Sequence, residues 1–97
     1  MPTIKTVIVD PQLMFVQGLQ SYLKAQTELD LEIIATLTDG GNIRQELSKF
    51  DNVDLLIMEL NLKGEDGLEM IPVIRKYFQD LKILICTSYD DISIVIV

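Results

Sequence analysis

Val53-Asp54-Leu55-Leu56-Ile57-Met58-Glu59, residues 53–59, is the stretch that decides the fold: an almost uninterrupted apolar run that ends in a carboxylate. Strands buried on both faces of a parallel sheet have near-continuous apolar runs, whereas half-exposed strands alternate polar and apolar residues. Similar runs occur at residues 4–9, 31–36 and 82–87. Together with residues 53–58 they predict four parallel strands.

The segments between these runs have the spacing of amphipathic helices. Residues 13–27 place apolar side chains three and four positions apart, which predicts one helix with an inward face formed by Phe15, Leu19, Tyr22, Leu23 and Gln26. A second helix is predicted from about Asn42, with Ile43, Leu47 and Phe50 facing inward. A third is predicted from about Asp66, with Pro72 inside it and an inward face of Leu68, Ile71, Ile74 and either Tyr77 or Phe78. Strands alternating with helices predict an α/β, doubly wound parallel sheet.

Composition narrows the function. The chain has 97 residues, a net charge of −7, one cysteine and no histidine. The length indicates one domain, and a single Cys86, expected to be buried, cannot form an internal disulfide. Without histidine, the common catalytic triads and most zinc sites are excluded. The acidic charge argues against DNA and anionic membranes, and the amino-terminal residues lack the pattern of a secretion signal, so we expect a cytoplasmic protein.

Three polar residues follow or end the apolar runs: Asp10, Glu59 and Thr87. In a parallel sheet the carboxyl ends of the strands meet at one edge, where ligands bind. Two carboxylates and a hydroxyl at such an edge could hold Mg²⁺ and a phosphoryl group. The alternative is that all three are ordinary polar caps at the points where strands leave the core.

Three segments in order resemble the receiver domains of response regulators, a CheY-like family, and in particular those of the NarL/LuxR type. They begin at Val7-Ile8-Val9-Asp10-Pro11, at Asp54-Leu55-Leu56-Ile57-Met58-Glu59 and at Leu81-Lys82-Ile83-Leu84. They correspond to the family's first strand and acidic turn, its third strand and phosphorylation loop, and its fourth strand. The resemblance implies a flavodoxin-like fold and a role in two-component phosphorelay signalling.

The resemblance also implies roles for particular residues. Asp10 matches the first acidic magnesium ligand, and Pro11 stands where the second acidic ligand is expected. Glu59 takes the place of the phosphate-accepting aspartate, Asn61 would offer its backbone carbonyl to the metal, and Thr87 matches the switch hydroxyl. The metal set is therefore Asp10, Glu59 and Asn61, with magnesium as a weak expectation and no other cofactor. The phosphate-binding lysine of the family's fifth strand has no counterpart.

We therefore expect a pseudo-receiver that is not an enzyme, has no catalytic residue and acts through protein contacts, with a histidine kinase or another signalling protein as partner. Direct DNA binding and a membrane are not expected. Glu59 could also imitate a phosphorylated aspartate. The alternatives are a magnesium-dependent phosphoacceptor that uses Glu59 or Asp10, and a fragment of a NarL/LuxR-type transcriptional regulator.

The carboxyl-terminal segment departs from the family. Set against the resemblance, the chain lacks the usual fourth helix, fifth strand and fifth helix, so residues 1–97 are expected to form one incomplete domain. Residues 92–97 are uncharged and mostly β-branched, which favours a strand. The preceding turn is too short for a parallel crossover. This tail, residues 88–97, should pair antiparallel with the fourth strand or with the tail of a second copy, giving a homodimer.

Overall fold

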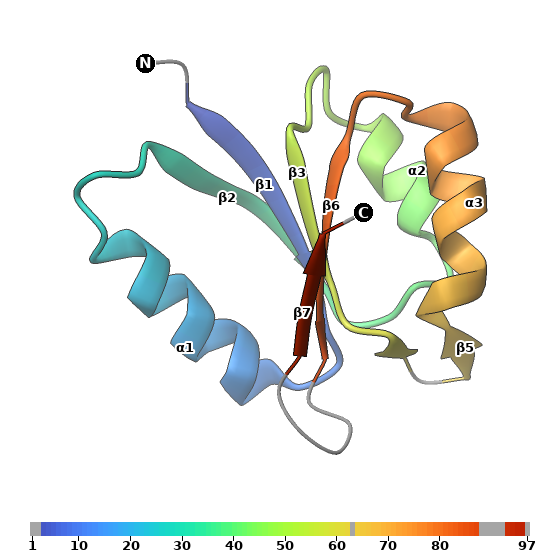
Figure 1. Ribbon diagram of the computed structural model, residues 1–97, viewed down its shortest axis with the longest axis horizontal. Coiled ribbons are helices and arrows are strands. Elements are labelled where there is room, and N and C mark those ends of the chain that lie inside the picture. The colour runs from blue at the N-terminus through green and yellow to red at the C-terminus, as the bar shows by residue number, and fades with distance from the viewer. Residues whose placement is uncertain (1–2, 63, 88–92, 97) are drawn as a thin grey trace.

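Five strands form one sheet in the order β2-β1-β3-β6-β7 (Figure 1). The computed structural model of the chain describes residues 3–62, 64–87 and 93–96. The strands of the sheet are β1 (Ile4–Val9), β2 (Leu31–Leu37), β3 (Leu55–Met58), β6 (Lys82–Thr87) and β7 (Ser93–Ile96). All four predicted strands are therefore present, with ends that differ by at most two residues.

Parallel pairing holds the first four strands together, as predicted. β1 pairs with β2 on one side and β3 on the other, and β3 pairs with β6. The registers place Val9 opposite Met58, and Met58 opposite Ile85. β7 instead runs antiparallel to β6, with Cys86 opposite Ile94. Of the two pairings left open for the tail, antiparallel pairing with the fourth predicted strand is the one that β7 shows.

The predicted self-association through residues 88–97 depends on a segment whose side chains, and much of whose backbone, lie outside the described residues. β7 itself is described only as a strand beside β6.

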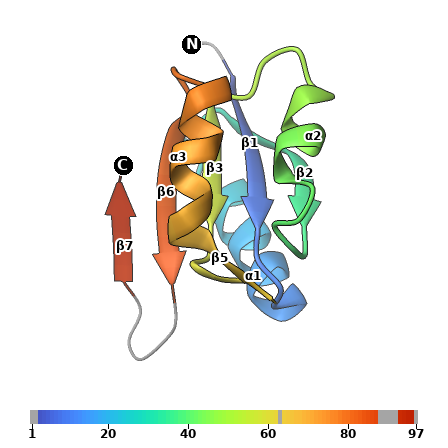
Figure 2. The same cartoon turned by 90° about the vertical axis from the view of Figure 1, so that its right-hand side faces the viewer.

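Helices cover both faces of the sheet. α1 (Leu13–Lys24) lies on one face, whereas α2 (Ile43–Ser48) and α3 (Gly67–Tyr77) lie on the other (Figure 2). In the described part of the chain, no helix combines the length and apolar character needed to cross a bilayer. The element order and strand order are those of the expected doubly wound, flavodoxin-like fold.

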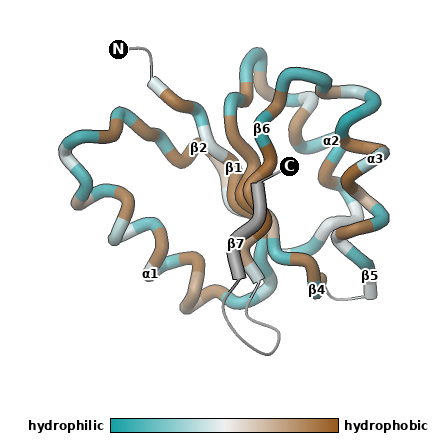
Figure 3. Tube along the Cα trace, in the orientation of Figure 1, coloured by the Kyte–Doolittle hydropathy of each residue, from teal (hydrophilic) through white to brown (hydrophobic). Residues whose placement is uncertain are grey.

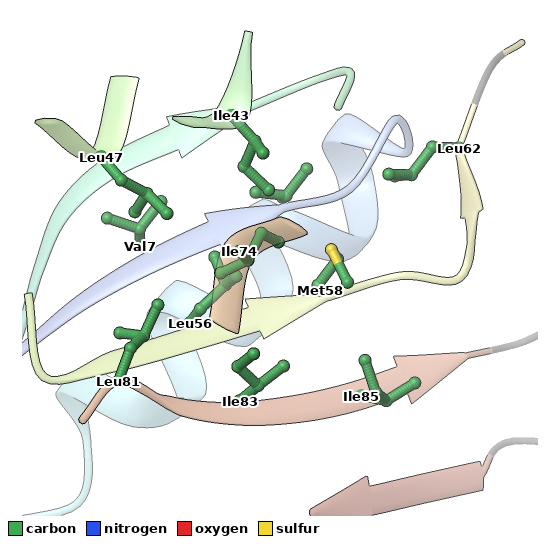
Figure 4. Packing of buried hydrophobic residues seen from close by; sticks show 11 residues of the cluster. Val7, Ile43, Leu47, Leu56, Met58, Leu62, Ile74, Leu81, Ile83 and Ile85 are labelled. Atoms are coloured by element: carbon green, nitrogen blue, oxygen red, sulfur yellow. The ribbon is translucent and has the colours of Figure 1, made fainter. Parts of the chain in front are cut away.

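Two apolar clusters fill the layers between helices and sheet, and the central strands are the most hydrophobic part of the trace (Figure 3). The larger cluster joins β1, β3 and β6 to α2 and α3, through residues that include Val7, Leu47, Leu56, Ile74 and Ile83 (Figure 4). The smaller cluster lies under α1 and contains Ile8, Val16 and Ile57. Burial on both faces is the reason that the strand sequences do not alternate.

Two side chains that were predicted to face the sheet, Tyr22 and Leu68, are instead exposed to solvent. Tyr22 is 65% exposed, and Val16 is the buried residue of α1. At 100° per residue Tyr22 lies about 120° around the helix from Val16, too far to meet the sheet. Leu68 is 58% exposed because it lies in the first turn of α3, beside an open hollow at the sheet edge. Cys86, expected to be buried, is half-buried.

A small hairpin between β3 and α3 was not predicted. Its two strands, β4 (Asn61–Leu62) and β5 (Glu65–Asp66), pair antiparallel across a turn in which Gly64 has a φ of 71°. Glycine adopts this left-handed conformation without the steric cost that a Cβ imposes. The Asp66 side chain then caps α3 by accepting a hydrogen bond from the Leu68 N–H at 2.9 Å.

At the end of the sheet where β1, β3 and β6 begin, Asp54 connects these three strands. Its carboxylate accepts a hydrogen bond from the Lys5 N–H at 2.9 Å, and its own N–H donates to the Lys5 carbonyl. The Asp54 carbonyl accepts from the Lys82 N–H at 3.1 Å. Asp54 therefore stabilises the register of β1, β3 and β6 at the start of the three strands.

Gly67 allows α3 to begin directly against the loop that follows β3. Its N–H donates to the Leu60 carbonyl at 2.8 Å. A Cβ added at this position would lie 2.8 Å from the Leu60 Cα and 2.9 Å from the Glu59 carbonyl oxygen. Both neighbours are backbone atoms, which cannot rotate away as a flexible side chain could.

We expect Gly67→Ala to lower the free energy of unfolding by about 1–3 kcal/mol, the usual cost of overpacking. The matched control is Gly18→Ala in α1, where an added Cβ would meet nothing within 4 Å. Alanine should stabilise that helix by about 0.5–1 kcal/mol. Urea denaturation followed by circular dichroism measures both, and equal effects of the two substitutions would contradict the packing argument.

Candidate functional site

Asp10 and Glu59 are the two acidic side chains that the sheet brings together. Asp10 directly follows β1 and Glu59 directly follows β3, and these strands are neighbours in register. The Glu59 N–H donates to the Val9 carbonyl at 3.0 Å, and the Asp10 N–H donates to the Leu37 carbonyl at 2.9 Å. Only 4% of Asp10 and 5% of Glu59 is exposed. The predicted acidic pair therefore exists and is buried.

The Asp10 carboxylate is held by the start of the next loop. Its Oδ1 accepts a hydrogen bond from the Gln12 N–H at 2.7 Å. Burial raises the pKa of Asp10 above its usual range, the hydrogen bond from Gln12 acts in the opposite direction, and the negative charge of Glu59 raises the pKa further. The two carboxylates therefore interact electrostatically.

The Glu59 carboxylate turns back onto its own loop. Its Oε2 accepts hydrogen bonds from the Leu60 N–H at 2.7 Å and from the Asn61 N–H at 3.4 Å. Gly67, at the start of α3, fixes the same loop from the other side through its hydrogen bond to Leu60. The Glu59 carboxylate, at the position of the family's phosphate acceptor, is thus hydrogen-bonded to the backbone amides of the two residues that follow it.

β6 supplies the third side of the site. Burial raises the pKa of the Cys86 thiol, and the negative charges of Glu59 and Asp10 raise it further. The next residue, Thr87, is half-buried and lines an apolar hollow of about 760 Å³ together with Leu60, Asn61, Leu62, Gly64, Asp66 and Leu68. Thr87 and the acidic pair therefore lie at one edge of the sheet, as predicted.

Sequence reasoning missed the parts of this site that depend on contact. Cys86 was expected to be a plain core residue, and the Leu60 and Asn61 amides were not expected to bind Glu59. The spacing of eight residues between Glu59 and Gly67 offers no local signal for a contact at this distance. Cys86 joins the site through the pairing of β3 with β6, and the Leu60 and Asn61 amides, one and two residues after Glu59, join it through the turn of the loop.

The donor set fits a magnesium ion poorly. Mg²⁺ prefers octahedral oxygen coordination and is bound in proteins through one or two carboxylates plus water. Here Asp10 and Glu59 each already accept at least one backbone N–H, and Pro11 supplies no carboxylate. In the part of the chain that the structure describes, no group of three or more His, Cys, Asp or Glu side chains could hold a metal.

Known proteins share this architecture and sequence. The chain is 38% identical over 89 residues to the oxygen regulatory protein NreC of Staphylococcus haemolyticus, covering 91% of this chain and 40% of NreC. It is 33% identical over 91 residues to the transcriptional regulatory protein LiaR of Bacillus subtilis, with the same two shares. The solved RcsB–DNA complex contains a chain with a TM-score of 0.77 and 25% identity, covering 89% of this chain and 43% of RcsB.

These relatives correct one expectation. We expected no direct binding to DNA, because the net charge is −7 and the sequence shows no DNA-binding segment. That exclusion is wrong, because LiaR is a transcriptional regulatory protein and RcsB has been solved on DNA. The chain spans about two fifths of the length of these proteins, so its charge describes only the part they share with it.

The family likeness covers nearly the whole chain. The description that matches is the response regulator receiver domain, over residues 6–97. This span contains every strand from β2 to β7, most of β1, and the acidic pair. The parallel strand order, the acidic edge and the sequence match agree. The chain belongs to the response-regulator receiver domain family of two-component signalling.

Proposed function

We propose that this receiver domain is a pseudo-receiver: it does not accept phosphate in the usual way and acts in the cytoplasm through contacts with other proteins. One observation carries the proposal, the engagement of the Glu59 carboxylate by the Leu60 and Asn61 amides. The expectation that the chain is not an enzyme is part of the same proposal.

The chemistry of phosphoryl transfer supports it. Transfer requires the nucleophilic oxygen in line with the leaving oxygen, and a misplacement of about 1 Å can cost about a hundredfold in rate. Glutamate extends its oxygens by one methylene beyond aspartate. Here the longer side chain turns back so that its Oε2 accepts the Leu60 N–H at 2.7 Å. An oxygen held in this hydrogen bond is not placed for in-line attack on an incoming phosphoryl group.

The metal position gives a second argument. A magnesium ion would neutralise the charge that develops on the phosphoryl group. Pro11 removes one of the two acidic residues that the family places after the first strand, and Asp10 already accepts the Gln12 N–H. Asp10, Glu59 and the Asn61 carbonyl are the groups that would hold the ion, and they are a weaker set than two free carboxylates and an acceptor aspartate.

For a longer protein that contains this domain, we propose a role in transcriptional regulation. The support is the match to transcriptional regulators of which this chain covers 40% of the length. DNA would then be contacted by the part of those proteins that this chain does not match. The receiver domain would act on that part through protein contacts.

We expect acetyl phosphate with MgCl2 to add no phosphoryl group to the wild-type chain, because its acceptor is held by backbone amides. The double substitution Pro11→Asp with Glu59→Asp restores both family residues and should gain magnesium-dependent phosphorylation, in which the phosphoryl group passes to the aspartate and acetate leaves. Intact-mass spectrometry measures the added phosphoryl mass. Addition of beryllofluoride with MgCl2 gives an independent readout. Its binding is measured by the change in amide NMR chemical shifts around Leu60 and Thr87.

The single substitutions separate the two causes. Pro11→Asp alone repairs the metal position, and Glu59→Asp alone repairs the acceptor, so each should give less phosphorylation than the double variant. Phosphate found on wild-type protein but not on Glu59→Gln would overturn the proposal. Failure of the double variant to be phosphorylated would show that other departures from the family, beyond these two residues, also block the reaction.

We expect Asp10→Asn to stabilise the protein at neutral pH. Since burial raises the folded pKa of Asp10 above its ordinary value of 3.8, ionisation opposes folding, and stability falls as the pH rises from about 3.8 through the folded pKa. Asparagine stays neutral and its Oδ1 keeps the Gln12 hydrogen bond. Thermal unfolding should therefore separate the two proteins at pH 7 and bring them together below pH 3.8.

Millimolar MgCl2 provides the control for that measurement. A bound ion would stabilise wild-type protein and reverse the advantage of Asp10→Asn. A pseudo-receiver with a weak site should show the same difference with and without MgCl2. A large stabilisation of the wild type by MgCl2 would contradict the proposed loss of the metal site.

A further inference from the structure

The face of α2 and α3 that points away from the sheet carries an arrangement of charge that the acidic edge does not use. The Arg44 guanidinium of α2 lies over the Tyr77 ring of α3, 3.7 Å from its centroid, and the Lys76 ammonium lies 5.6 Å from the same centroid. Two cations from two helices therefore meet at one exposed aromatic ring in a chain of net charge −7. In the described part of the chain, neither cationic group has an ion pair.

Arg44 also lines a hollow of about 410 Å³ between α2 and α3. Ile43, Met70 and Ile74 give it apolar walls, and Val73, which is 50% exposed, stands at its edge. This volume lies within the range of pockets that bind small ligands or an anchoring side chain.

The hollow is charged with opposite sign at its two ends. Arg44 lies near the carboxyl-terminal end of α3, where it stacks on Tyr77. Asp66 and Glu69 line the hollow at the amino-terminal end of that helix. Eight residues separate Glu69 from Tyr77, about 12 Å along the helix axis. Arg44 stays on the ring and forms no ion pair with either carboxylate among the described residues.

We propose that this α2–α3 hollow is a docking site for a peptide segment of a partner protein. The segment would carry an acidic residue for Arg44 and Lys76, a large aliphatic side chain for the hollow, and a basic residue for Glu69. Charge complementarity at both ends selects such a segment, because an all-acidic peptide would meet Asp66 and Glu69 and an all-basic peptide would meet the two cations. The site is separate from Glu59 and does not depend on phosphorylation there.

Fluorescence anisotropy tests the proposal with a labelled peptide that contains two glutamates, two central leucines and two lysines, separated by alanines. We expect saturable binding to the wild-type chain. Arg44→Glu should weaken it about tenfold or more, because attraction at one end becomes repulsion. Lys24→Glu, which makes the same charge change at the end of α1, should leave the affinity unchanged within about twofold.

A charge exchange distinguishes binding from a structural role of Arg44. A peptide in which the two glutamates are replaced by lysines should bind Arg44→Glu more tightly than it binds wild type. Lys76→Glu, which leaves the Arg44–Tyr77 stack in place, should also weaken the original peptide. Equal affinity of wild type and Arg44→Glu for both peptides would overturn the proposal, as would absence of binding at millimolar peptide. If the wild-type chain dimerises and Arg44→Glu abolishes the dimer, the α2–α3 face binds a second copy of the chain. That result would also overturn the proposal.

Discussion

Parallel pairing of β3 with β1 on one side and β6 on the other is the constraint on which the rest of the structure depends. It sets Val9, Met58 and Ile85 at one level, so that the residues that follow them leave the sheet together. A register slip of one residue would turn every side chain of a strand to the opposite face. The meeting of Asp10 with Glu59 is thus a consequence of register, and their burial is a consequence of where they meet.

Two buried carboxylates need donors, and here the backbone provides them. Each acid is hydrogen-bonded by the loop that follows its own strand: Asp10 by Gln12, and Glu59 by Leu60 and Asn61. Hydrogen bonds from amides stabilise the ionised form and partly offset the cost of desolvation. Gly67 then holds the second loop against α3. The result is an acidic edge whose two carboxylates are held by backbone amides.

The two edges of the sheet have different roles. At the amino edge, Asp54 connects three strands, and the Arg75 side chain donates to the Phe78, Gln79 and Leu81 carbonyls just after α3. These contacts join the two side chains to backbone groups and serve stability. At the carboxyl edge the polar groups are side chains that converge from separate strands. The α2–α3 face is a third region, where Arg44 and Tyr77 join two helices over an apolar hollow.

From the sequence alone, the four parallel strands, the two-sided helical cover, the meeting of Asp10 with Glu59 and the position of Thr87 at the same edge of the sheet could be predicted. Continuous apolar runs report burial on both faces, and chain direction places the polar ends of the runs at one edge. The exposure of Tyr22 and Leu68 could not be predicted, because periodicity indicates a face without saying which part of it meets the sheet. Nor could the β4–β5 hairpin, the hydrogen bonds to Glu59 or the Arg44–Tyr77 contact. The hairpin and the Arg44–Tyr77 contact depend on how α3 packs against the loop and α2, which is decided only when residues distant in the sequence pack together. The hydrogen bonds to Glu59 are local, and they depend on the conformation that its side chain adopts once it is buried.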